Sequence, residues 1–145
     1  METMKGIRKL GLLIGGIVLL CMGVVVFLKN KSKEDVVVVR SGFESVTAYP
    51  QVQTQSLFED EKEVIASLIA PLGVSGKQVL EYYKSEFGSE GWKIVEENEN
   101  DILAEDGEGN MYRVWIYFSG GDGEAVIYNV DYVLAGNEML PIPVQ

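Results

Sequence analysis

The chain has 145 residues, the length of one ordinary domain, with 12 basic and 22 acidic side chains and no histidine. Apolar and acidic residues are segregated along it. Residues 1–35 hold 6 basic and 3 acidic side chains, a net charge of +3, whereas residues 36–145 hold 6 basic and 19 acidic ones, a net charge of −13. With 47% hydrophobic residues and one cysteine, this composition excludes a disordered chain, a disulfide-rich scaffold and a collagen-like repeat.

Residues 1–9 form a basic N-terminal tail, and a run of 19 uncharged, mainly apolar residues follows at Leu10–Leu28. As a helix this run would extend about 28 Å at about 1.5 Å per residue, close to the ~30 Å hydrocarbon core of a bilayer. It is longer than the apolar part of a cleaved signal peptide, and Val26, Phe27 and Leu28 stand where a cleavage site needs small residues. We therefore predict a transmembrane helix at 10–28.

Four glycines lie within the predicted transmembrane helix: Gly11, Gly15, Gly16 and Gly23. The first two have the GxxxG spacing that lets two membrane helices approach closely. Glycine is also common in membrane helices, so two interpretations stay open. One is ordinary composition, and the other is packing against a second copy or a larger membrane partner.

Basic residues flank both ends of the run, so the charge balance across the membrane is nearly even. The short basic tail at 1–9 nevertheless favours retention of that end in the cytoplasm. We expect a single-pass signal anchor in the bilayer, with the C-terminal domain outside the cytoplasm.

Residues 29–61 are interpreted as a juxtamembrane linker and extended segment. The four valines Val36–Val39 are β-branched and favour an extended backbone. Residues 40–61 are polar and irregular, which indicates a loop with one edge strand.

The folded domain is expected at 62–134. Glu63–Ala70 predicts a buried strand, although its apolar run is also compatible with a short helix. Ser75 and Gln78 then have the spacing of a capping box, in which each side chain satisfies a backbone N–H of the other residue. A one-sided apolar stripe follows, so we predict a helix at Ser75–Phe87 with Gly88 at its C-terminal end.

Four strands separated by turn residues are predicted after this helix: Trp92–Glu97, Asp101–Glu105, Met111–Phe118 and Ala125–Leu134. Their short connections favour antiparallel neighbours and hence a meander. The predicted fold class is α+β, with an N-terminal transmembrane helix and then one main helix packed on an antiparallel β-meander. Residues 135–145 form an extended tail that either docks on the domain or stays away from it.

The last two predicted strands alternate between two faces. One face is apolar and is expected to lie under the helix: Tyr112, Val114, Ile116 and Phe118, then Val126, Tyr128, Val130, Tyr132 and Leu134. The opposite face supplies the candidate partner-binding residues: Arg113, Trp115, Tyr117, Ile127, Asn129 and Asp131.

An exposed tryptophan beside a tyrosine and an arginine is typical of protein interfaces. If Trp115 is exposed in this way, its truncation to alanine will cost the fold much less than truncation of Ile116. The alternative is that a second layer, formed by residues 36–60, covers this face.

Residues 71–134 contain the sequence Val-Leu-Glu-Tyr-Tyr-Lys at 79–84, then Gly91-Trp92 and the strands beyond. These features resemble small extracytoplasmic domains of bacterial membrane-anchored proteins and lipoproteins. Such domains have a helix of the form V-L-x-Y-Y-K, a glycine–tryptophan start to a strand and an antiparallel hairpin region. The resemblance covers under half of the chain and implies a fold. Most such domains have no assigned activity, so it implies no functional residue.

Residues for chemistry are scarce. The chain has no histidine, and its one cysteine, Cys21, lies within the predicted membrane helix. Acidic turn residues could bind Ca²⁺, but they lack EF-hand spacing and are interpreted as a solvated acidic surface. We therefore predict no catalytic, cofactor-binding or metal-binding residue. A charge of −13 on residues 36–145 also disfavours nucleic acid as a partner.

Three functions remain open. The first is a membrane-anchored, non-catalytic accessory or interaction subunit of an envelope complex, bound to a larger membrane protein or to its own copy. The second is an envelope sensor or ligand-binding domain with a pocket between helix and sheet. The third is a small hydrolase that uses carboxylates. We take the first as the main hypothesis.

Overall fold

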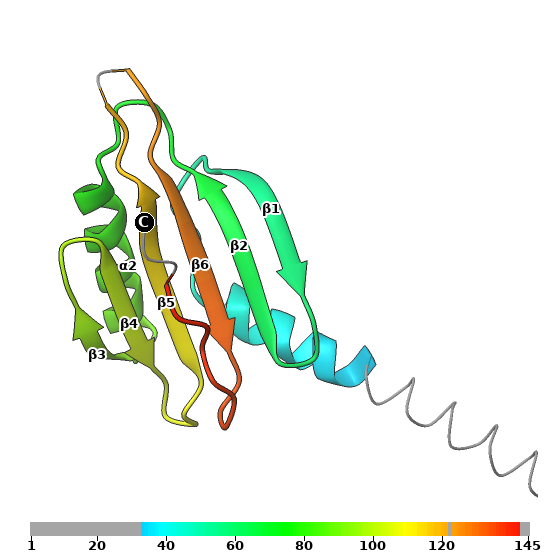
Figure 1. The fold of residues 1–145 in the computed structure, drawn as a ribbon. Coiled ribbons are helices and arrows are strands. Elements are labelled where there is room, and N and C mark those ends of the chain that lie inside the picture. The colour runs from blue at the N-terminus through cyan, green and yellow to red at the C-terminus, as the bar shows by residue number, and fades with distance from the viewer. Residues whose placement is uncertain (1–32, 122, 143–145) are drawn as a thin grey trace, which may run out of the picture. The chain divides into compact units, whose positions relative to one another are not determined.

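A computed structural model describes residues 33–121 and 123–142 (Figure 1). The chain divides into two compact units after Glu34, and the sheet belongs to the second of them, Asp35–Gln145. Residues 33–44 are helical, and one further helix and six strands follow. Their bounds are β1 Gln53–Glu59, β2 Glu63–Ile69, α2 Gly76–Ser89, β3 Lys93–Glu97, β4 Asp101–Glu105, β5 Met111–Phe118 and β6 Ile127–Val133.

The six strands form one antiparallel sheet in the order β1-β2-β6-β5-β4-β3. The predicted α+β class and the meander β3–β6 are therefore confirmed. The sheet is wider than predicted, because the hairpin β1–β2 is added beside β6. Residues 35–61, which the sequence indicated as a linker, thus belong to the folded unit.

The four valines Val36–Val39 are helical, and the predicted extended segment is wrong. Val39 and Val46 are 0% and 3% exposed, and Phe43 stacks on Tyr112 with ring centroids 5.9 Å apart. The spacing of four residues places Val39 and Phe43 on one face of the helix, and Val46 is buried just beyond the end of the helix. The helix propensity of valine is lower than that of alanine, by less than about 0.7 kcal/mol per residue. Burial of this face more than offsets that small cost.

Helix α2 begins as predicted. The Ser75 hydroxyl accepts from the Gln78 N–H at 3.2 Å, and the Gln78 side chain accepts from the Ser75 N–H at 2.8 Å. The helix runs past Gly88 and ends at Ser89, with Glu90 as its C-cap; Gly91 follows with a φ of +79°, which suits glycine. The Trp92 N–H then donates to the Phe87 carbonyl at 2.8 Å, which is a Schellman closure.

The core lies between the two helices and one face of the sheet (Figure 1). Most of the predicted core residues of β5 and β6 are buried there: Tyr112, Val114, Val126, Tyr128, Val130 and Tyr132. The predicted core position of Phe118 is wrong, because the register of β5 shifts between Ile116 and Phe118. Phe118 pairs with Ile127 instead and is 42% exposed.

Among the described residues, neither helix combines the length and apolar character that crossing a bilayer requires. The predicted span at 10–28 lies outside the described residues, with the glycines assigned to helix packing there: Gly11, Gly15, Gly16 and Gly23.

Candidate partner-binding face

The predicted partner-binding residues of β5 and β6 lie opposite one another in the sheet. Arg113 pairs with Asp131 and Trp115 pairs with Asn129. Side chains alternate between the two faces of a strand, so these four residues share the face opposite the helices. In Figure 1 this face carries the C-terminal tail, drawn in red, and both helices lie on the other side.

Trp115 is 9% exposed, so the expectation of an exposed tryptophan is wrong. Its indole N–H donates to Asp131 Oδ2 at 3.2 Å, and its ring meets Tyr117 edge to face with centroids 6.0 Å apart. The alternative of a covering layer from residues 36–60 is also wrong, because that segment supplies a helix on the core side and the strand β1. The segment on the face of Trp115 is the tail that follows β6.

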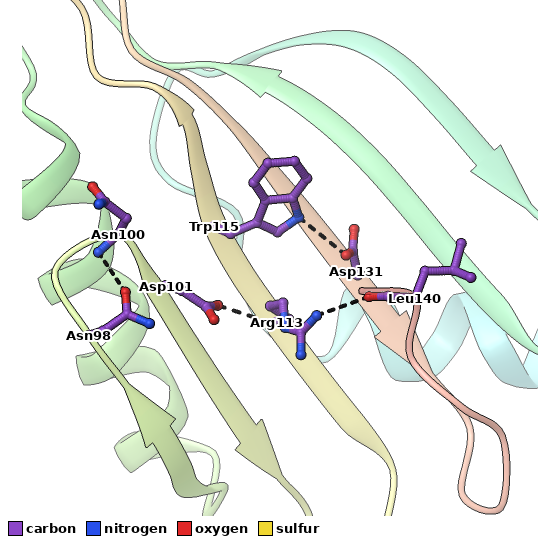
Figure 2. Close-up of polar contacts among 7 residues, drawn as sticks. All are labelled: Asn98, Asn100, Asp101, Arg113, Trp115, Asp131 and Leu140. Atoms are coloured by element: carbon purple, nitrogen blue, oxygen red, sulfur yellow. Dashed lines mark hydrogen bonds and ion pairs between the residues drawn. The ribbon is translucent and has the colours of Figure 1, made fainter. Parts of the chain in front are cut away.

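Arg113 lies at the centre of a polar cluster on this face (Figure 2). Its Nε is 3.8 Å from Asp101 Oδ1 on β4, and its Nη1 donates to the Leu140 carbonyl of the tail at 3.1 Å. Asp131 lies across the strand pair from it. Two carboxylates therefore flank one guanidinium.

The cluster is more deeply buried than the face of a sheet without a covering helix would normally be. Asp101 and Asp131 are 5% and 8% exposed, and the Arg113 side chain is 13% exposed. Burial raises the pKa of Asp131 to about 6, against the opposing effects of the Trp115 hydrogen bond and the Arg113 charge. Burial also raises the pKa of Asp101, although Arg113 acts to lower it.

Three polar atoms of this cluster make no hydrogen bond to other protein groups: Asp101 Oδ1, Arg113 Nε and Asp131 Oδ1. A buried donor or acceptor without a partner costs about 1–3 kcal/mol, and more when it is charged. The cluster is therefore incompletely satisfied by the residues that cover it.

The other part of this face is apolar and open to solvent. Ile127 pairs with Ile69 on one side and with Phe118 on the other, so three strands place apolar side chains in one row. Phe118 and the neighbouring Tyr117 are 42% and 51% exposed. We call Ile69, Tyr117, Phe118 and Ile127 the apolar row.

Asp101 and Leu140 were not identified as candidate site residues from the sequence. Asp101 is the first residue of β4, directly after a turn, where an aspartate is normally solvated, and only the pairing of β4 with β5 brings it to Arg113. Leu140 contributes its backbone carbonyl, so its side chain gave no signal.

Another acidic turn residue, Asp106, forms hydrogen bonds within its own turn. Asp106 accepts from the N–H groups of Glu108 and Asn110, both at 2.9 Å, and so closes the β4–β5 turn. Across residues 33–121 and 123–142, no cluster of three or more cysteine, aspartate or glutamate side chains is placed to hold a metal ion.

Comparison with known proteins adds no assignment: no protein-family model, no curated protein and no solved structure matches this chain. The resemblance of residues 71–134 to small extracytoplasmic domains of bacterial envelope proteins stays a prediction from its sequence motifs.

Proposed function

We propose that this chain is a single-pass membrane-anchored, non-catalytic interaction subunit that binds a larger membrane protein through the sheet face opposite its helices. The observation that carries the proposal is the apolar row, in which Tyr117 and Phe118 are 51% and 42% exposed beside Ile127. Aromatic side chains gathered on a face without a helix layer are typical of the centre of a protein interface.

The net charge of the domain indicates which residues surround the contact surface on the partner. Residues 36–145 carry a net charge of −13, so a partner surface with basic residues around an apolar centre is electrostatically complementary. The anchor in this proposal is the uncharged run Leu10–Leu28, and the short basic tail before it supports an extracytoplasmic position for the domain.

The sensor alternative receives less support from the geometry. It requires a pocket between helix and sheet, but Val79, Tyr83 and Phe87 fill that space and are each 0% exposed. An open surface depression lies at the edge of the fold, between the first turns of α2 and the β3–β4 turn; its lining residues are Lys77, Leu80, Glu81, Glu97, Asn98 and Glu99.

The hydrolase alternative would rest on the two buried carboxylates beside Arg113. Asp101 and Asp131 are both buried beside Arg113: Asp101 forms an ion pair with its guanidinium, and Asp131 lies opposite Arg113 on the neighbouring strand. Neither carboxylate lines the depression along α2 or the smaller one beside Arg40. An interaction role is therefore the better-supported proposal.

The test is purification of the full chain from native membranes in a mild detergent. We expect a larger membrane protein to accompany it in fixed ratio, and Phe118→Ser to release that protein. Val95→Ser is the matched control, because Val95 is 45% exposed and lies on β3 at the far edge of the sheet. Purification of the chain without a stoichiometric partner, or equal loss of the partner in both variants, would contradict the proposal.

A further inference from the structure

The strand β1 forms one edge of the sheet (Figure 1). Its residues Gln53–Phe58 are all exposed, whereas alternate residues of the neighbouring β2 are buried. Two of them are large and apolar: Leu57 and Phe58 are 54% and 53% exposed and point to opposite faces of the sheet. In the part of the chain that the structure describes, no further strand pairs with the outer side of β1. This edge is therefore open to pairing with another strand.

The two edges of the sheet differ in charge. Charged side chains are one means by which proteins prevent a free edge from pairing. The strand β3, at the other edge, has three charged residues among its five: Lys93, Glu96 and Glu97. The strand β1 has one, Glu59, and the Arg40 Nε donates to its carboxylate at 3.0 Å. The β1 edge thus lacks the protection that the β3 edge has.

The turn between β1 and β2 determines which backbone groups of β1 face outward. The Asp60 N–H donates to the Glu63 carbonyl at 3.0 Å, so these two residues form a hydrogen-bonded pair. Hydrogen-bonded and non-hydrogen-bonded pairs alternate along an antiparallel ladder, and this ladder is regular from Ser56 to Glu59. Glu59 and Leu57 therefore occupy non-hydrogen-bonded positions. Their N–H and C=O groups point away from β2, where a further strand would meet them.

We propose that β1 pairs with β1 of a second copy of this chain, antiparallel and with Leu57 opposite its own counterpart, so that two sheets join edge to edge. Leu57 suits the centre of such a pair because it lies in the regular part of the strand and its backbone donor and acceptor face outward. The arrangement is symmetric and closed, so neither copy keeps an exposed β1 edge. The contact is separate from the apolar row and goes beyond the proposed function.

The distribution of charge favours a second copy over another protein. Residues 45–58 contain no charged side chain, although residues 36–145 carry a net charge of −13. Two copies that meet along β1 keep their acidic surfaces apart, and repulsion between exposed charges is screened over about 8–10 Å at physiological ionic strength. A basic partner finds no unpaired carboxylate on this strand, because Glu59 is bound to Arg40.

The side chains of β1 are also complementary to those of their own copy. Residues 53–56 are glutamine, threonine, glutamine and serine, and each of these side chains both donates and accepts hydrogen bonds. With Leu57 at the centre, Gln55 of one copy lies opposite Glu59 of the other, and a glutamine amide donates to a carboxylate. The two Leu57 side chains meet at the symmetry axis, where each covers apolar surface of the other.

The first test is disulfide formation between single cysteines in the full chain, with the native cysteine removed as Cys21→Ser. Leu57→Cys is expected to form a covalent dimer in membranes under mild oxidation, because directly opposite Cα atoms lie about 5.5 Å apart, within the reach of a disulfide. Equivalent residues move apart by roughly 6.6 Å for each step from the centre. Gln53→Cys, which is equally exposed, is therefore the matched control and is expected to stay monomeric.

Charge substitution at position 57 tests the same register without a covalent bond. Leu57→Lys and Leu57→Glu each place like charges opposite one another, so each is expected to weaken dimerisation about fivefold in sedimentation of the detergent-solubilised chain. When the two variants carry different tags and are produced together, they are expected to pair with each other. Val95→Lys, on the charged edge β3, is the control and is expected to dimerise like the unchanged chain.

Equal crosslinking at positions 57 and 53, crosslinking at neither, or equal loss of the dimer in Leu57→Lys and Val95→Lys would overturn the inference. If a charged variant does not fold, the two cysteine variants decide the matter. A larger membrane protein recovered with single copies of the chain would overturn this inference alone. A dimer recovered without a larger protein would contradict the proposed function and support this inference.

Discussion

Trp115 connects the two parts of the candidate face. Its indole N–H donates to Asp131 in the buried cluster, and its ring contacts Tyr117 in the apolar row. A side chain in this position contributes to the fold as well as to the surface. The alternation of side chains along β5 correctly predicts the face on which Trp115 lies. Alternation cannot predict that a segment after β6 buries Trp115.

Truncation of Trp115 is therefore expected to destabilise the fold more than truncation of Ile116, the reverse of the expectation from sequence. Trp115→Ala removes a large side chain that is 9% exposed and takes a donor from Asp131, so the free energy of unfolding falls by about 3–5 kcal/mol. Ile116 is only partly buried, and Ile116→Ala is expected to cost about 1–2 kcal/mol. Thermal melts of the two purified variants check the order, and a smaller loss for Trp115→Ala would contradict it.

Asp131 gives the fold a defined dependence on pH. Its pKa is raised to about 6 in the folded chain, so folded protein binds the proton more tightly than unfolded protein does. The resulting stabilisation is complete below the unfolded pKa of about 3.9 and is lost as pH rises through about 6. The charged groups that act on the Asp131 carboxyl are Arg113, Glu63 and Asp101. A pKa shift of about two units changes the free energy of unfolding by at most about 3 kcal/mol.

The Asp131→Asn variant is the test of this pH dependence. Asparagine still accepts from the Trp115 indole but does not ionise, so we expect a higher Tm at about pH 7.5 and a flatter change in stability between about pH 5 and pH 7.5. Glu99→Gln, on the exposed β3–β4 turn, is the control and is expected to leave the slope unchanged. An Asn variant with the slope of the unchanged chain would show that another group titrates.

At the scale of the elements, the helix at 33–44 packs against the side chain of Tyr132 at Gly42. A Cβ atom added there would lie 2.0 Å from the Tyr132 hydroxyl oxygen on β6. Gly42→Ala is therefore expected to destabilise the fold by about 1–3 kcal/mol, although alanine is the better helix former.

Gly88→Ala in α2 is the matched control for Gly42→Ala. A Cβ at Gly88 meets nothing within 4 Å, so this change is expected to raise the free energy of unfolding by about 0.5–1 kcal/mol. Chemical denaturation measures both variants. A Gly42→Ala chain as stable as the unchanged one would show that the helix does not pack on Tyr132 in this way.

Local sequence signals predicted the elements whose cause is local. The capping box at Ser75 and Gln78 fixes the start of α2, and the turn residues between strands fix the meander. The helix at 33–44 was mispredicted because four valines favour a strand, and only contact with residues far along the chain, such as Tyr112, stabilises the helix. The place of β2 beside β6 has the same non-local origin.

The candidate face was predicted only in part, because some of its contacts join residues that are far apart in the sequence. Alternation within β5 and β6 placed Arg113, Trp115 and Asp131 on one face, which their pairing in the sheet bears out. The contact of Arg113 with the Leu140 carbonyl involves a backbone atom, so no residue type in the sequence indicates it. The β-bulge that turns Phe118 out of the core is likewise a property of the pairing with β6.

At the scale of the whole molecule, the segregation of charge separates an apolar, basic beginning from an acidic folded unit. From the run Leu10–Leu28 we expect the full chain to stay in the membrane fraction after carbonate extraction. A chain that begins at residue 33 keeps the described helix and sheet and serves as the control, which is expected in the soluble fraction. Release of the full chain by carbonate would contradict the proposed anchor.

The central claim is that the sheet face opposite the helices contacts a larger membrane protein. Site-specific photo-crosslinking in intact membranes tests it most directly, with the photoreactive residue at position 118 in the apolar row or at position 95 on β3, both exposed. The account predicts one discrete high-mass product from position 118 and none from position 95. Crosslinking from position 95 alone, or from neither position, would contradict it.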